Sequence, residues 1–128
     1  MEHLSSFEAA AKSQGIDPTK LPEVSLLPEA LGKATVAAYK LFVISQAAWQ
    51  GVKIDWNNYS QYKYYPWFDL ETYAEKVGSG AGFSYYGGFS YDRTSSIVGS
   101  RLCFPDSKTA KYVGETHFQL YRDLMVIE

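Results

Sequence analysis

The sequence has few of the residues on which most metal and redox sites depend. Its 128 residues include one cysteine, Cys103, and two histidines, His3 and His117. A single thiol excludes an internal disulfide and a thiolate metal cage, and it fits a reducing compartment better than an extracellular one. Two histidines so far apart in the chain do not predict a metal site. We therefore expect no metal, no cofactor and no catalytic residues.

A strong charge of one sign and long apolar runs are lacking as well. Twelve Lys and Arg against 14 Asp and Glu give a formal net charge of −2, with no basic stripe to bind nucleic acid. The most apolar run, residues 34–49, is too short to span a membrane and contains Lys40. Residues 1–7 lack the basic start and the long apolar core of a signal peptide. We expect a cytoplasmic protein that binds neither nucleic acid nor a membrane.

The chain does contain enough apolar material for one folded domain. Hydrophobic residues make up 46% of it and charged residues 20%, a balance that excludes disorder over most of the length. Its size is typical of a single domain, which we assign to residues 1–128. The first half is aliphatic, whereas most aromatic residues lie from Trp56 onward.

A short helix is predicted near the start of the chain. Ser5 and Glu8 have the spacing of a capping box, in which the Ser5 hydroxyl meets the third amide and Glu8 reaches back. The helix should continue to about Gln14, because Gly15 then supplies the left-handed residue that ends many helices. Three prolines should hold residues 16–27 extended.

A longer helix is predicted over residues 29–50. Pro28 and Glu29 fit its first turn, since proline loses no hydrogen bond there and an acid meets the positive end of the dipole. Apolar residues recur every three or four positions and extend around most of the cylinder, up to Gly51. A helix that is apolar on most sides is buried on most sides, so we expect this one to be the central core helix.

The second half predicts a small antiparallel sheet and a final helix. Aromatic residues favour a strand over residues 64–70, and period-two alternation favours another over residues 81–92, bulged at Gly87-Gly88. Residues 97–104 should return as a further strand, and Asp106 or Ser107 can cap a helix that reaches about Leu124. The predicted fold is α+β, with N-terminal helices, a meander and a C-terminal helix on one sheet face.

Arg101, Cys103 and His117 are the candidate polar groups of a pocket. A cysteine nucleophile needs a histidine base, and His117 lies about one strand-to-helix connection from Cys103. A cysteine flanked by Leu102 and Phe104 on a strand is more commonly a small apolar filler. A small enzyme or ligand-binding domain that uses this pocket is therefore the alternative function.

Seven aromatic residues crowd into residues 56–68. Tyr and Trp combine a large apolar body with a polar tip, so they suit core edges and binding surfaces alike. So many rings are hard to bury together, and we expect part of them to contact a protein partner or another copy of the chain. The candidate binding residues are Trp56, Tyr59, Tyr62, Tyr64 and Trp67.

Four motifs carry a resemblance to a known family. They are YKYYPWF at residues 62–68, GFSY at 82–85, GSRLCF at 99–104 and YVG at 112–114. This succession resembles a family of small uncharacterised proteins of gut Bacteroidetes and their phages and prophages. The resemblance implies a phage or prophage origin and a cytoplasmic or virion location, and it implies no activity. With the aromatic surface, it predicts a non-enzymatic interaction or structural protein.

Overall fold

The computed structural model describes residues 1–53, 55, 57, 62–69, 84–92 and 100–126, with the backbone alone at 67–69, 84–92 and 100. These ranges contain the helices α1 (Phe7–Ser13), α2 (Glu29–Trp49), α4 (Ser107–Thr116) and α5 (Phe118–Met125). They also contain two 3-10 turns, η1 (Glu2–Leu4) and η2 (Ser100–Leu102), and two strands, β1 (Lys63–Asp69) and β2 (Ser84–Asp92). The described part is α+β with helices predominating, which is the class that the sequence predicts.

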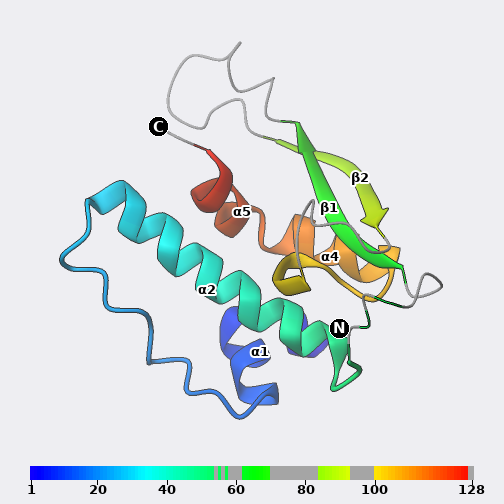
Figure 1. Cartoon of the computed structure of the whole chain (residues 1–128), viewed down its shortest axis with the longest axis horizontal. Coiled ribbons are helices and arrows are strands. Elements are labelled where there is room, and N and C mark those ends of the chain that lie inside the picture. The colour runs from blue at the N-terminus through cyan, green and yellow to red at the C-terminus, as the bar shows by residue number, and fades with distance from the viewer. Residues whose placement is uncertain (54, 56, 58–61, 70–83, 93–99, 127–128) are drawn as a thin grey trace.

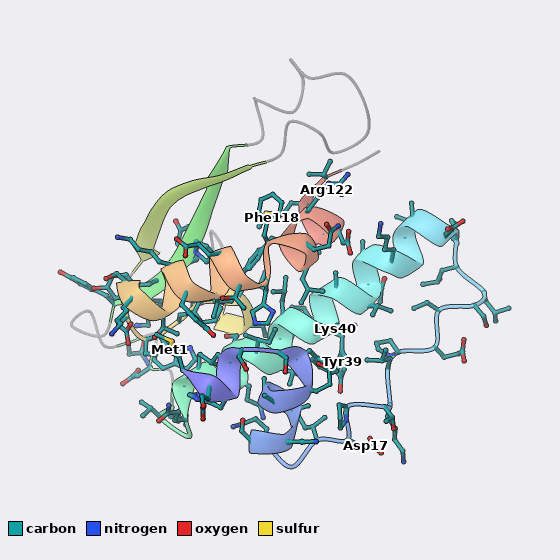
Figure 2. All side chains as sticks on the ribbon, turned by 180° about the vertical axis from the view of Figure 1, so that it is seen from behind. Met1, Asp17, Tyr39, Lys40, Phe118 and Arg122 are labelled. Carbon is teal, nitrogen blue, oxygen red and sulfur yellow. The ribbon has the colours of Figure 1, made fainter. Side chains whose placement is uncertain are left out.

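Helix α2 lies at the centre of the arrangement (Figure 1). Helix α1 packs on one side of it and α5 on the other, and the two strands lie beyond α4. The ring of Phe7 on α1 makes an edge contact with Tyr39 of α2, with centroids 6.1 Å apart, and Lys40 Nζ lies 5.4 Å from the Phe7 ring centroid. Figure 2 shows Tyr39 and Lys40 where α2 passes α1. Aromatic packing and a cation–π contact therefore join the first helix to the core helix.

Helix α1 begins later than the capping-box pattern predicts. The N-cap is Ser6, whose Oγ accepts a hydrogen bond from the Ala9 amide at 3.1 Å. Ser5 Oγ instead donates to the Glu2 carbonyl at 2.7 Å, because η1 precedes α1 and leaves that oxygen within reach. Gly15 adopts a φ of 70°, which confirms its predicted place after the helix.

Helix α2 has the predicted position, but its burial is uneven along its length. Leu41 and Ile44 are fully buried in its second half, whereas Leu31 near its start is 61% exposed. The expectation of burial on most sides is therefore wrong for the first turns, which extend beyond the neighbouring helices (Figure 1). The apolar pattern cannot reveal this difference, because it is set by how far the neighbouring elements reach along α2.

The segment before α2 approaches it closely at one glycine. Gly32 is buried, and a Cβ placed on it would lie 3.1 Å from the Cβ of Val24. Such a separation is tight, so the absence of a side chain at Gly32 lets Val24 lie against the helix.

Strands β1 and β2 pair antiparallel, with an irregular register. Trp67 is opposite Gly88, but Phe68 is opposite Tyr85, so β2 contains two extra residues at this point. The irregularity falls at Tyr86 and Gly87, next to the predicted bulge at the glycine pair. Helix α4 packs against both strands.

The predicted meander is not shown by the described residues. Residues 93–99 lie outside them, and residues 100–102, expected as strand, form η2 instead. Phe104 alone pairs with β1, through backbone hydrogen bonds of 2.9 and 2.6 Å with Tyr64. The physical reason lies at Cys103, whose carbonyl accepts hydrogen bonds from α2 and so draws this segment to the helix.

Two C-terminal helices replace the single helix that the sequence predicts. Asp106 caps α4 as predicted and accepts a hydrogen bond from the Thr109 amide at 2.7 Å. The chain then breaks at His117, and α5 turns onto α2, where Asp123 lies 3.5 Å from Lys33 Nζ. Gly114 lies buried inside α4 without ending it.

Replacing Leu41 by Ala tests where the core lies. Leu41 is fully buried in the middle of α2, so the truncation should lower the free energy of unfolding by about 2–5 kcal/mol. The matched control is Leu26→Ala, because Leu26 is 97% exposed and should change stability by less than about 0.5 kcal/mol. Urea unfolding measures both, and equal midpoints for the two variants would place the core elsewhere.

Candidate functional site

The aromatic stretch is described only in part. Trp56 and Tyr59 lie outside the described residues, and Trp67 is described by its backbone alone. Tyr64 packs against the hydrophobic core, and its ring makes an edge contact with Tyr62 at a centroid distance of 6.3 Å. Two of the five predicted binding residues, Tyr62 and Tyr64, therefore lie together, and Tyr64 lies at the edge of the core.

Exposed leucines form a group that the sequence analysis missed. They lie within eleven residues before and at the start of α2, and we name them the leucine end: Leu21 (43% exposed), Leu26 (97%), Leu27 (45%) and Leu31 (61%). Leu27 and Leu31 fit the apolar stripe of α2, so the sequence places them in the core. Large exposed apolar groups in a soluble protein commonly mark contact surfaces.

Cys103 has a structural environment. Its side chain is 1% exposed, and its carbonyl accepts hydrogen bonds of 2.8 Å from both Ser45 Oγ and Trp49 Nε1 of α2. A thiolate nucleophile needs solvent access and a nearby positive group. This burial is what the interpretation of Cys103 as an apolar filler predicts.

His117 is also held inside the fold. The residue is 8% exposed, and its Nε2 lies 2.7 Å from the carbonyl oxygen of Leu4, so the ring ties the start of α5 to η1. Burial lowers the pKa of His117 below its usual value, and the bond to Leu4 and the charge of Glu8 oppose that shift without cancelling it. A neutral ring that donates Nε2–H to a carbonyl fits this environment.

Arg101 does not complete a pocket with these two residues. It is exposed, and its guanidinium carbon lies 5.9 Å from the centroid of the Phe42 ring on α2. A described pocket of about 370 Å³ lies elsewhere, between the start of the chain, the end of α2 and the start of α4. Arg101, Cys103 and His117 are not among its lining residues.

One buried cation was not anticipated. Lys63 at the start of β1 is fully buried, and its Nζ donates a hydrogen bond of 2.8 Å to the carbonyl of Asp55. Buried lysines require such partners, so this contact fixes the start of β1 against the preceding loop. The sequence offers no signal for it, because an alternating strand residue is expected to reach solvent.

Metal and membrane sites are not found within the described ranges. No group of three His, Cys, Asp or Glu residues there is placed to hold a metal ion. No helix in the same part of the chain is long and apolar enough to cross a membrane. Comparisons with known protein families, with curated proteins and with solved structures find no match.

The burial of Cys103 predicts slow reaction with thiol reagents. In the native protein the absorbance change with Ellman's reagent should develop slowly, because the sulfur is reached only when the structure opens. In guanidinium, where the protein is unfolded, the Cys103 thiol should react with the reagent at its full rate. Fast native modification that accelerates as the thiol ionises would contradict the structural role and support the enzyme alternative.

Protein stability should fall as the pH drops below about 6.5, the unshifted pKa of His117. Burial lowers that pKa in the fold, so between the two pKa values the unfolded chain binds a proton that the folded chain does not. Above pH 6.5 the neutral ring makes its full contribution to the free energy of unfolding. As the pH falls from 6.5 toward the folded-state pKa, that contribution is lost at up to about 1.4 kcal/mol per pH unit. Urea unfolding at a series of pH values measures it.

Two variants isolate His117 in that measurement. His117→Gln keeps a donor for the Leu4 carbonyl without titrating, so it should flatten the slope, whereas His3→Gln should preserve it. Hydrogen bonds lower the pKa of Asp17 and Glu23 below 3.8 and 4.5, so these two groups act in a more acidic range. A slope that persists in His117→Gln would contradict the assignment.

Proposed function

We propose that this protein is a non-enzymatic interaction or structural protein that acts by binding another protein. The observation that carries the proposal is the leucine end, where Leu26 is 97% and Leu31 is 61% exposed. Single exposed leucines are ordinary, but four within eleven residues of sequence favour association, because their burial removes apolar area from water.

The aromatic stretch supports the same function, because it offers a second contact surface. The side chains of Tyr62 and Tyr65 are half-buried, so each retains a solvent-facing part. Rings of this kind anchor many protein interfaces. Strand β1 and the start of α2 lie at opposite ends of the molecule (Figure 1), so the two surfaces can engage different neighbours. Two separated contacts suit a structural or bridging role, and the partner at either one can be another copy of the chain.

The origin and location that we propose rest on the resemblance of the sequence motifs. A phage or prophage protein found in the cytoplasm or in the virion would use such surfaces to assemble with other proteins. The alternative, a small enzyme or ligand-binding domain at Arg101, Cys103 and His117, has less support. Two of these three side chains are buried. Side chains of α2 donate to the Cys103 carbonyl, and the ring of His117 is bound to the Leu4 carbonyl.

The test replaces exposed apolar side chains without touching the core. Leu26→Ser with Leu31→Ser should change the free energy of unfolding by less than about 0.5 kcal/mol each, while weakening association by about 2 kcal/mol if these residues anchor an interface. Tyr62→Ser examines the aromatic surface in the same way. Sedimentation velocity over a wide range of protein concentrations measures self-association, and cross-linking from photo-leucine at positions 26 and 31 in cells measures contact with other proteins.

The matched control is Val52→Ser, because Val52 is 59% exposed and lies outside both surfaces. It should alter neither sedimentation nor cross-linking. The proposal fails if the parent protein is monomeric throughout and positions 26 and 31 give no more cross-links than position 52.

A further inference from the structure

The first half of α2 has an apolar face that the described elements leave partly open. Residues spaced by three and four positions form it, and we name it the open face: Leu27, Leu31, Ala34, Ala38 and Phe42. Leu27 is 45% and Leu31 is 61% exposed, and the other three are half-buried. Such spacing places side chains along one side of a helix. In Figure 1, α1 and α5 flank α2, and no labelled helix or strand is drawn across it.

The charged residues of α2 lie on the other side of the helix. They are Glu29, Lys33 and Lys40. At about 3.6 residues per turn, all three are on the side away from Leu31. Lys33 Nζ lies 3.5 Å from Asp123 of α5, and Lys40 Nζ lies 5.4 Å from the centroid of a ring of α1. The open face therefore carries no charged residue of α2.

Thr35 borders the open face, and its hydroxyl is bonded within the helix. Its Oγ1 donates a hydrogen bond of 2.8 Å to the Leu31 carbonyl. A hydroxyl with a partner in its own helix loses less when a neighbour covers it and excludes water. The first turns of the open face can therefore enter an apolar contact at little cost.

We infer that the open face packs against the open face of a second copy of this chain, with the two α2 helices antiparallel about a two-fold axis. The inference rests on the proposed function and names the partner at the leucine end, which shares Leu27 and Leu31 with the open face. In a two-fold contact the same surface meets itself, so a patch of one charge sign would be repelled. An uncharged apolar face has no such penalty, and pairing removes both faces from water.

The order of large and small residues fits an antiparallel pair. Where Leu31 of one copy lies opposite Ala34 of the other, Leu27 lies opposite Ala38, because antiparallel helices run in opposite directions from their centre. Large side chains then face small ones at every position of the contact. Such alternation lets the side chains of two helices interlock. The alanines therefore allow the helices to approach, and the leucines fill the space between them.

The charges at the two ends of the open face have opposite signs. At one end, the Arg101 guanidinium carbon lies 5.9 Å from the centroid of the Phe42 ring. At the other end, residues 20–29 contain one Lys and two Glu, which gives a net charge of −1. In the antiparallel pair, Phe42 of each copy lies toward this segment of the other copy. Opposite charges at both ends of the contact therefore favour a second copy in this orientation.

A charge swap at Leu31 tests the pairing. Leu31 is 61% exposed, and Glu and Lys are good helix formers, so Leu31→Glu and Leu31→Lys should fold as the parent does. In the antiparallel pair the two copies of position 31 lie within about one helical turn of each other, so either variant alone brings like charges together. Each should self-associate at least about tenfold more weakly than the parent.

Mixing the two variants should restore association, because opposite charges then meet across the two-fold axis. Sedimentation equilibrium of the parent should give a dissociation constant of about 10–100 μM, as expected of a contact between single helices. Native mass spectrometry with one variant labelled with ¹⁵N counts mixed and uniform dimers. Val52→Glu and Val52→Lys are the matched controls, since Val52 is 59% exposed and lies outside the open face. They should dimerise as the parent does, alone or mixed.

Three outcomes would overturn the inference. They are a parent that stays monomeric up to about 1 mM, Leu31 variants that dimerise as tightly as the parent, and a mixture that associates no better than either variant alone. If photo-leucine at position 31 still cross-links to other proteins in cells, the proposed function stands and only the partner named here is wrong. If those cross-links are also missing, the proposed function fails as well.

Discussion

Two hydrogen bonds from α2 to a single carbonyl join the halves of this protein. Ser45 and Trp49 both donate to the carbonyl of Cys103, inside the fold. In a low-dielectric interior an unpaired carbonyl is costly, so this contact decides where the chain passes after η2. Phe104 follows at once and pairs with Tyr64, so the position of β1 depends on the same point. Strand, turn and core helix thus share one anchor.

His117 makes a second buried contact of this kind. Its bond to the Leu4 carbonyl ties η1 to the corner between α4 and α5, and that corner lets α4 contact the strands while α5 contacts α2. His117 therefore has a structural contact through its ring, and Cys103 has one through its backbone carbonyl. The Cys103 thiol is buried, as is common for a free cysteine, and the imidazole of His117 has a backbone partner.

The surfaces that remain are of different kinds. The leucine end is apolar and lies before and at the start of α2, the aromatic stretch runs into β1, and the pocket beside Asp106 is small. An apolar surface gains free energy by excluding water from a large area, whereas a pocket gains specificity from a few placed polar groups.

Local patterns by themselves determined α1, α2 and the start of α4, the N-caps of these helices to within a residue, and the irregularity at the glycines of β2, because these depend on neighbours along the chain. Only the tertiary structure decided that residues 100–102 leave the predicted strand, that the last helix breaks at His117, and that Leu31 is exposed while Leu41 is buried. Apolar periodicity shows which side of a helix prefers burial, but the reach of its neighbours decides which turns are covered. The pocket could not be predicted either, since its walls come from three segments that only the folded chain brings together.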